Sequence, residues 1–431
     1  MLAGGGPLGT HDDFVAGDEA ALTYPPQVTS PKAAPVGSRV LVTAAVLLLA
    51  INLRPVVNAL GAVIPELRDA TGLPAGTTGL LLSLPTLSFA VLGLTAPALA
   101  ARFGAHRTVV IALIALIAGQ LVRSVLPGTP ALFLGSVLAL AGIAIANVVM
   151  PGLVRLHFPD RIPLMTAAYT TLLTIGGAAS AAATLPIARA VGGDWRTGIG
   201  MWAVTAIIAL IPWLLMLRAD RGQHRPAAGA RLPLSALART RVAWALAIYF
   251  GCQSMVAYVV FGWLAEILTD SGMTDTAAAF QVAIAITVGI PLAMLVPPLL
   301  GRARRPQFLV ITLSSCYLAA FIGIIFASGA MVTVLSVLFG IGTGAFPLAL
   351  TLIALRSRTA LATTSLSAFT QCCGYLIASA GPLGFGLLYD LSGDWTVPLL
   401  AMCGVVLIQA VAGCLAVRPR FVEDELPAQV G

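Results

Sequence analysis

The first long apolar run of this chain contains the stretch that decides the fold: residues 40–63 read VLVTAAVLLLAINLRPVVNALGAV. At about 1.5 Å of helical rise per residue, this run is long enough to cross a hydrocarbon core of about 30 Å. Arg54 lies about 22 Å along such a helix from Arg39, well inside that core. A guanidinium at this depth costs about 2.5–3.5 kcal/mol on insertion scales and normally faces a protein interior or an aqueous cavity. The stretch therefore predicts a membrane-spanning helix with a functional cation.

The residues around Arg54 indicate an irregular, polar turn of this helix. Pro55 has no backbone N–H, so the carbonyl of Ile51 loses its helical partner at the same depth. Arg54, Asn58 and Gly61 follow at i, i+4 and i+7 and share one stripe. We expect a binding site for an anion or a strongly polar solute, with Arg54 supplying charge, Asn58 orientation and Asn52 a further contact. The alternative is structural: Arg54 bonds freed carbonyls or locks two helices, and the amides bridge helices.

Composition places the whole chain in a membrane. Of its 431 residues, 58% are hydrophobic and 10% are charged, and the mean hydropathy is +0.96. These values are typical of polytopic membrane proteins and exclude a soluble globular protein. The net charge of +7 does not indicate a nucleic-acid partner, because the arginines form short clusters between apolar runs. We expect the lipid bilayer as the surrounding partner.

The cysteines and histidines give no indication of a metal or cofactor. All six cysteines fall inside apolar runs and none has a zinc-type spacing with histidine. We expect small buried apolar side chains at these positions, no metal site and no cofactor.

Twelve apolar runs are long enough to span a membrane. They cover residues 40–63, 76–100, 107–126, 130–155, 163–188, 197–217, 242–265, 277–300, 307–327, 331–354, 361–388 and 396–417. We predict a disordered cytoplasmic tail at 1–38, an N-terminal six-helix bundle at 39–217, a cytoplasmic linker at 218–240, a C-terminal six-helix bundle at 241–417 and a cytoplasmic tail at 418–431. The tail at 1–38 is not a signal peptide, because its start lacks a basic region.

Basic residues between the runs predict the orientation. With both termini inside, the inner segments hold nineteen Lys and Arg residues and the outer loops hold four. This asymmetry satisfies the positive-inside rule. We therefore expect a multi-pass protein of the plasma membrane with both termini cytoplasmic.

The two halves of the sequence repeat each other at an offset of 200 residues. The offset places Pro97 on Pro297, Arg102 on Arg302, and Gly193-Asp194-Trp195 on Gly393-Asp394-Trp395. A constant offset along the chain indicates an internal repeat. We predict an all-α membrane protein with twelve transmembrane helices in two pseudo-symmetric six-helix bundles. This is the major facilitator fold, with the solute bound between the halves.

Several short motifs in residues 52–107 resemble those of one transporter family. They are Asn52-Leu53-Arg54-Pro55, Ile64-Pro65-Glu66-Leu67-Arg68, Gly79-Leu80-Leu81, Ser83-Leu84-Pro85, and Leu99-Ala100-Ala101-Arg102-Phe103-Gly104 with Arg107. Together they are similar to the cyanate/2-nitroimidazole transporter family of the major facilitator superfamily. The resemblance implies transport of a small anion or nitro compound. It also implies a gating loop with Arg102, Gly104 and Arg107, in which Pro97 and Ala101 replace the usual glycine and acid.

Further candidates lie in the other spans. For substrate contact we expect neutral side chains that hydrogen-bond or stack on a flat solute: Asn147, Tyr169, Gln253, Tyr258, Gln371 and Tyr375. Each of them has helix-to-helix bonding as its alternative role. Glu66 and Glu266, at the outer ends of the first and seventh spans, are candidates for proton coupling, or are simply solvated. Arg123 is expected to reach the membrane interface, with a second anion anchor as its alternative.

The sequence favours a carrier over an enzyme or a sensor. The four histidines are His11, His106, His157 and His224, all outside the spans, so no His–acid pair forms within a span. We predict a secondary transporter, monomeric, that moves a small anion or polar nitro compound by alternating access. The alternatives are a drug-type efflux carrier of the same fold and a transporter-like sensor.

Overall fold

The computed structural model describes residues 36–73, 75–219, 232–326 and 331–426, and this part of the chain forms helices and no strand. Within these described ranges, twelve helical segments are long and apolar enough to cross a membrane. They are 39–62, 84–103, 105–125, 129–157, 159–190, 195–217, 241–270, 280–302, 307–326, 331–355, 360–392 and 396–416. The twelve predicted spans are confirmed. The predicted tail falls mostly outside the described residues, and α1 begins at Val36.

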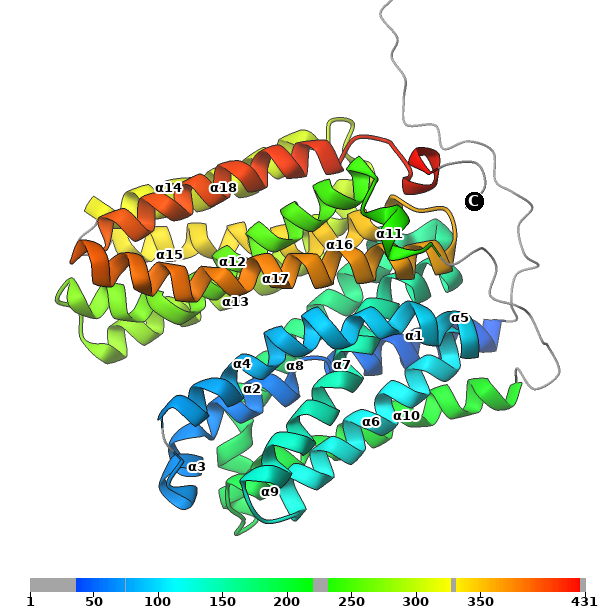
Figure 1. The fold of residues 1–431 in the computed structure, drawn as a ribbon, viewed down its shortest axis with the longest axis horizontal. Coiled ribbons are helices and arrows are strands. Elements are labelled where there is room, and N and C mark those ends of the chain that lie inside the picture. The colour runs from blue at the N-terminus through cyan, green and yellow to red at the C-terminus, as the bar shows by residue number, and fades with distance from the viewer. Residues whose placement is uncertain (1–35, 74, 220–231, 327–330, 427–431) are drawn as a thin grey trace, which may run out of the picture. The chain divides into compact units, whose positions relative to one another are not determined.

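The first six spans form the N-terminal set of helices (Figure 1). Its elements are α1 Val36–Ile51, α2 Pro55–Ala62, α3 Ile64–Thr71, α4 Ala75–Leu92, η1 Gly93–Thr95, α5 Ala96–Phe103, α6 Ala105–Val125, α7 Thr129–His157, η2 Pro159–Arg161, α8 Ile162–Ala190, α9 Trp195–Gly200 and α10 Trp202–Ala219.

The last six spans form the C-terminal set, after the short helix α11 Leu234–Leu237 within the predicted linker. Its elements are α12 Arg241–Asp270, α13 Asp275–Arg302, α14 Gln307–Phe326, α15 Met331–Gly342, α16 Ala345–Leu355, α17 Ala360–Ser392, α18 Thr396–Ala416 and η4 Val422–Glu425.

Each set packs mainly within itself, and a few helices join the two. In the N-terminal set α6 packs on α7 and α1 on α10, whereas in the C-terminal set α12 packs on α17 and α18. The sets meet where α17 contacts α4 and α7, and where α13 and α16 contact α8. Residues on these helices can therefore line a site shared by both sets.

Contacts between the sets are tight at the membrane end that carries Arg102 and Arg302, here called the basic end. Arg155 Nη1 donates to the carbonyl of Ala354 at 2.8 Å, which joins α7 to α16. A Cβ on Gly152 would lie 2.9 Å from the Ala360 carbonyl, so α7 and α17 are in backbone contact there. The two sets are closed against each other at this end.

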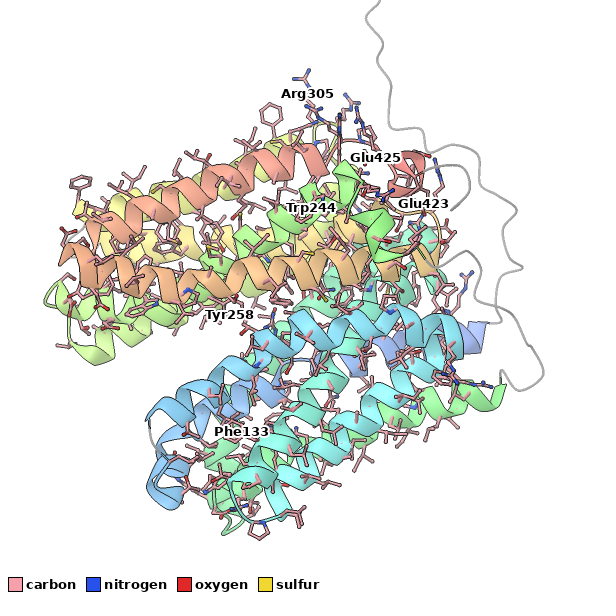
Figure 2. All side chains as sticks on the ribbon, viewed as in Figure 1. Phe133, Trp244, Tyr258, Arg305, Glu423 and Glu425 are labelled. Atoms are coloured by element: carbon pink, nitrogen blue, oxygen red, sulfur yellow. The ribbon has the colours of Figure 1, made fainter. Side chains whose placement is uncertain are left out.

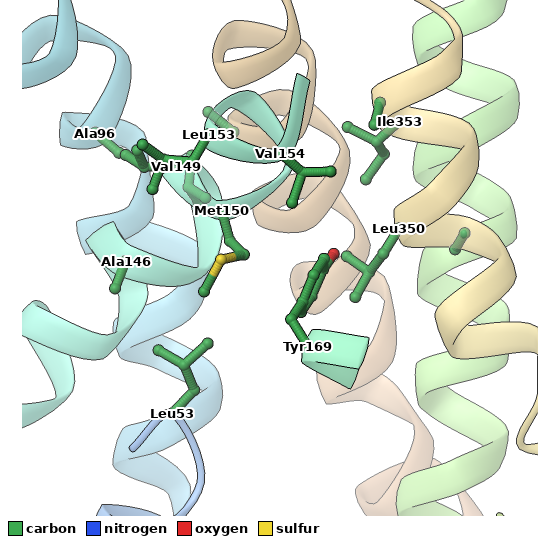
Figure 3. Close-up of a cluster of buried hydrophobic side chains, with 14 of the residues drawn as sticks. Leu53, Ala96, Ala146, Val149, Met150, Leu153, Val154, Tyr169, Leu350 and Ile353 are labelled. Carbon is green, nitrogen blue, oxygen red and sulfur yellow. The ribbon is translucent and has the colours of Figure 1, made fainter. Parts of the chain in front are cut away.

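The largest buried apolar cluster crosses the boundary between the sets. Figure 3 shows Met150, Val154 and Tyr169 of the N-terminal set beside Leu350 and Ile353 of the C-terminal set. Many large apolar side chains instead point outward, as is expected where the solvent is lipid.

The segment after α18 is docked on the basic end. Val422 is fully buried and its N–H donates to the Arg356 carbonyl at 2.9 Å. Arg358 forms an ion pair with Asp424, and Glu425 accepts from the Val242 N–H at the start of α12 at 3.1 Å. Figure 2 shows Glu423 and Glu425 at the same end of the C-terminal set as Arg305. The predicted tail at 418–431 therefore includes an ordered, helix-bound part.

Candidate functional site

The first span is interrupted at Asn52–Arg54. Helix α1 ends at Ile51, and α2 begins at Pro55. The turn between them is closed by short bonds, from the Asn52 N–H to the Leu49 carbonyl at 3.0 Å and from the Leu53 N–H to the Ala50 carbonyl at 3.1 Å. Proline suits the first position of α2, because its missing N–H would have no partner there. Arg54 thus occupies a helix break in the middle of a span.

Two glycines of α8 let the chain approach this break. A Cβ on Gly176 would clash with the Ile51 carbonyl oxygen. A Cβ on Gly177 would lie 2.9 Å from Asn58 Nδ2 and 3.1 Å from Arg54 Cβ. This close approach allows Asn58 Nδ2 to donate a hydrogen bond to the Gly177 carbonyl at 3.1 Å. The stem of Arg54 and the amide of Asn58 are therefore positioned by α8.

The Arg54 guanidinium points to the other set of helices. It is half-buried, and its Cζ lies 5.5 Å from the centre of the Phe346 ring on α16. This is within the range of a cation–π interaction. No hydrogen bond or ion pair of this guanidinium occurs among the described residues. Its five N–H donors are available to a ligand.

The span that carries Phe346 is itself interrupted. Helix α15 ends at Gly342 and α16 begins at Ala345. The turn is closed by bonds from the Gly344 N–H to the Ile341 carbonyl at 3.1 Å and from the Phe346 N–H to the Thr343 carbonyl at 3.0 Å. Pro347 follows and supplies no N–H. Two helix breaks, one from each set, thus place Arg54 and Phe346 together.

Aromatic rings extend from Phe346 across the C-terminal set to α4. Phe250 lies 6.0 Å from Phe346 and 5.2 Å from Tyr375, centroid to centroid. Tyr375 stacks on Phe89 at 5.1 Å. We call Phe89, Phe250, Phe346 and Tyr375 the aromatic cluster. Tyr258, the other predicted tyrosine of the C-terminal set, is half-buried on α12.

Three other residues predicted to contact the solute are Asn147, Gln253 and Gln371. Gln371 bonds Asn147 across the boundary between the sets, and Gln253 bonds a neighbour within the C-terminal set. Gln371 Nε2 donates to the Asn147 carbonyl at 3.3 Å and to Ser367 Oγ at 2.7 Å. Gln253 Nε2 donates to Ser254 Oγ at 2.6 Å, and the Gln253 side chain is buried. The side-chain amides of Gln371 and Gln253 are therefore engaged with protein groups, whereas Asn147 takes part through its backbone carbonyl.

The side chains of Asn52 and Tyr169 are buried between helices. Asn52 is buried against α10, where its Nδ2 donates to the Thr205 carbonyl at 3.2 Å and its Oδ1 accepts from Thr205 Oγ1 at 2.7 Å. Tyr169 is buried in the apolar cluster of Figure 3. Their side chains contribute to packing between helices.

The two outer glutamates are not brought together with Arg54. Glu66 forms an ion pair with Arg189 at 2.8 Å, and Glu266 is exposed near the end of α12. Both lie at the opposite end from the basic loops.

The predicted gating loop forms a tight turn between α5 and α6. Gly104 has a φ of 83°, which favours glycine, and its carbonyl accepts from the Thr108 hydroxyl at 2.8 Å. Arg102 and Arg107 are exposed, and the Arg102 guanidinium lies over the ring of Phe103 at 5.2 Å.

Arg123 differs from its expected placement at the membrane interface. Its side chain is 0% exposed, and Nη1 and Nη2 donate to the Val56 carbonyl at 3.2 and 3.3 Å. Since Val56 follows Pro55, this arginine bonds the second half of the broken first span. The expectation failed because α7 packs closely on α6 here and the side chain turns inward to the Val56 carbonyl, so it is enclosed before it can reach the interface.

The site as a whole offers a cation, aromatic faces and hydroxyl groups. Within the described ranges, no group of three or more His, Cys, Asp and Glu residues could hold a metal ion. Phe89, Phe250 and Phe346 were not predicted, because a phenylalanine in an apolar run gives the same signal as any core residue. Such a site can bind a negative charge and stack on a planar group.

The sequence profile described as Major Facilitator Superfamily matches residues 46–382. This chain belongs to that superfamily. Members of it are transporters, so the chain is a carrier by family and not an enzyme. The predicted family resemblance and the predicted major facilitator fold are confirmed.

Relatives of the chain include three bacterial transporters. The Uncharacterized transporter YycB of Bacillus subtilis (strain 168) is 34% identical over 381 residues, covering 88% of this chain and 93% of the relative. The 2-nitroimidazole transporter of Escherichia coli (strain K12) is 32% identical over 387 residues, covering 89% and 97%. The cyanate transport protein CynX of the same organism is 28% identical over 367 residues, covering 84% and 94%.

Solved structures show the same fold at low sequence identity. The major facilitator transporter FucP, in its outward conformation, superposes with a TM-score of 0.69 at 14% identity, over 88% of this chain and 98% of that protein.

Proposed function

We propose that this superfamily member is a secondary transporter of a small anion or polar nitro compound, working by alternating access in the plasma membrane with both termini cytoplasmic. The observation that carries the proposal is the Arg54 guanidinium. It is half-buried in a helix break, faces Phe346 of the other set, and has no hydrogen bond or ion pair among the described residues. A charge at this depth is costly unless a ligand or cavity compensates it.

The position of Arg54 supports a role in transport as well as binding. It belongs to the N-terminal set, and its ring partner belongs to the C-terminal set, so a solute bound there contacts both. Relative motion of two such sets around a fixed site is the general mechanism of carriers with this architecture. The names of the 2-nitroimidazole and cyanate transporters among its relatives agree with a small polar solute.

The test is solute flux into liposomes that contain the purified full chain. Candidate solutes are cyanate, nitrite, 2-nitroimidazole and small carboxylates. We expect Arg54→Gln, which keeps hydrogen bonding but removes charge, to reduce anion flux at least tenfold while the protein still inserts. Arg305→Gln, in an exposed loop at the basic end, is the matched control and should transport normally. Normal flux in Arg54→Gln would refute the anion proposal.

Two other classes of protein, a drug-type efflux carrier and a sensor, would give different results in the same flux assay. A drug-type efflux carrier would move neutral or cationic aromatic compounds independently of Arg54. A sensor would bind a solute without moving it.

A further inference from the structure

The aromatic cluster gives the candidate site more than a charge. Phe346 is half-buried, so part of its ring is accessible beside Arg54. Phe250 and Tyr375 are 0% and 4% exposed, and Phe250 packs behind Phe346. The site therefore combines a guanidinium with an accessible aromatic face.

The rings are held by elements of both sets, which keeps their faces in place. Phe346 contacts Phe250 at 6.0 Å, Phe250 contacts Tyr375 at 5.2 Å, and Tyr375 stacks on Phe89 of α4 at 5.1 Å. Cys372 Sγ donates to the Phe89 carbonyl at 3.4 Å, which adds a bond beside the last of these contacts. Preorganised rings bind a flat ligand with little loss of side-chain freedom.

A linear anion would use only part of this arrangement. Its charge would pair with Arg54, but it has no face to place on Phe346. A planar aromatic ring is stabilised by stacking beyond the area that it buries. Aromatic residues thus favour a flat solute over a linear one of equal charge.

We infer that the solute is a single-ring planar aromatic monoanion. Its negative group pairs with Arg54, and its ring lies against Phe346. This inference rests on the proposed function and makes Phe346 a specificity-determining residue.

The experiment compares benzoate with cyclohexanecarboxylate by isothermal titration calorimetry on the purified full chain in detergent. The two probes have the same charged group and ring size, but only benzoate is planar and aromatic. We expect benzoate to bind at least fivefold more tightly. Phe346→Leu should bring the ratio of the two dissociation constants near one, and Phe346→Trp should keep it. The control Phe308→Leu, on an exposed face of α14, should leave the ratio unchanged.

The results distinguish a failure of this inference from a failure of the proposed function. Equal affinity of the wild-type chain for both acids overturns the inference, as does a ratio that Phe346→Leu leaves unchanged. If cyanate binds in an Arg54-dependent way and benzoate does not bind, the inference fails and the proposed function stands. If Arg54→Gln binds every tested anion as the wild type does, the proposed function fails as well.

Discussion

Arg54 is positioned through its backbone and stem, and its guanidinium makes no hydrogen bond or ion pair among the described residues. Gly177 allows α8 to lie against Arg54 Cβ, and its carbonyl fixes the Asn58 amide at 3.1 Å. A larger residue at this point would have to displace one of these two side chains. The placement of the guanidinium beside Phe346 therefore depends on Gly177, which itself has no side chain.

We predict that Gly177→Ala reduces transport several-fold without preventing insertion. The added Cβ would lie 2.9 Å from Asn58 Nδ2 and 3.1 Å from Arg54 Cβ, so both must shift by a few tenths of an ångström. Gly61→Ala is the control, because a Cβ there meets nothing within 4 Å. Flux and melting temperature should be measured for both variants. Equal flux in the two variants would show that the α8 contact does not position the site.

Individual site residues could be predicted from the sequence only where a charge or a break marks them. Arg54 stood out because it is a cation in an apolar run. The amides Asn52 and Gln253 look equally suitable in sequence, yet the first bonds Thr205 and the second bonds Ser254. Which neighbour a polar side chain faces depends on how helices cross, and a single sequence does not contain that information.

Two spans are broken at the depth of the site, and their breaks face each other. The first break follows from Pro55, which the sequence marks directly. The second lies at Thr343–Gly344, where Pro347 lacks the N–H that would bond the Thr343 carbonyl in a continuous helix. Breaks of this kind are tolerated in membranes where they are enclosed by protein or line a cavity.

We predict that Pro347→Ala raises the melting temperature and lowers flux. Alanine supplies the missing N–H and is a better helix former by about 3 kcal/mol, so the tenth span should straighten and carry Phe346 away from Arg54. Pro130→Ala is the control, since Pro130 lies in the first turn of α7, where no helical bond is lost. Measurements of thermal stability and flux on both variants test this. Unchanged flux in Pro347→Ala would mean that the break has no part in transport.

The two sets of helices, taken together, are closed at the basic end. Arg155 donates to the Ala354 carbonyl at 2.8 Å, close to the tight approach of Gly152 to α17. The twelve spans and the superfamily were predictable, because apolar length and short motifs mark them. Which end of the molecule is closed could not be predicted, because the two states of a carrier have the same sequence.

We predict that Arg155→Ala shifts the population toward a state with the basic end open. A hydrogen bond from a charged donor contributes about 1.5–3 kcal/mol, which corresponds to a shift of roughly tenfold or more. Spin labels at Leu156 and Arg304, on a chain with its cysteines replaced by alanine, should show longer distances in this variant. Arg161→Ala, an exposed neighbour, should leave the distance distribution unchanged. A distance distribution in Arg155→Ala identical to that of the wild type would show that the Arg155–Ala354 bond does not hold the basic end closed.

Under the proposed function, the Arg54 guanidinium would also set how a membrane voltage acts on the transport cycle. A bound monoanion would neutralise Arg54, so the empty carrier would return with one more positive charge than the loaded carrier. Each completed cycle then moves one negative charge, and an inside-negative potential of 100 mV contributes about 2.3 kcal/mol to outward movement. Without a coupled ion, the resting cell would itself drive the solute out, to a gradient of roughly fiftyfold.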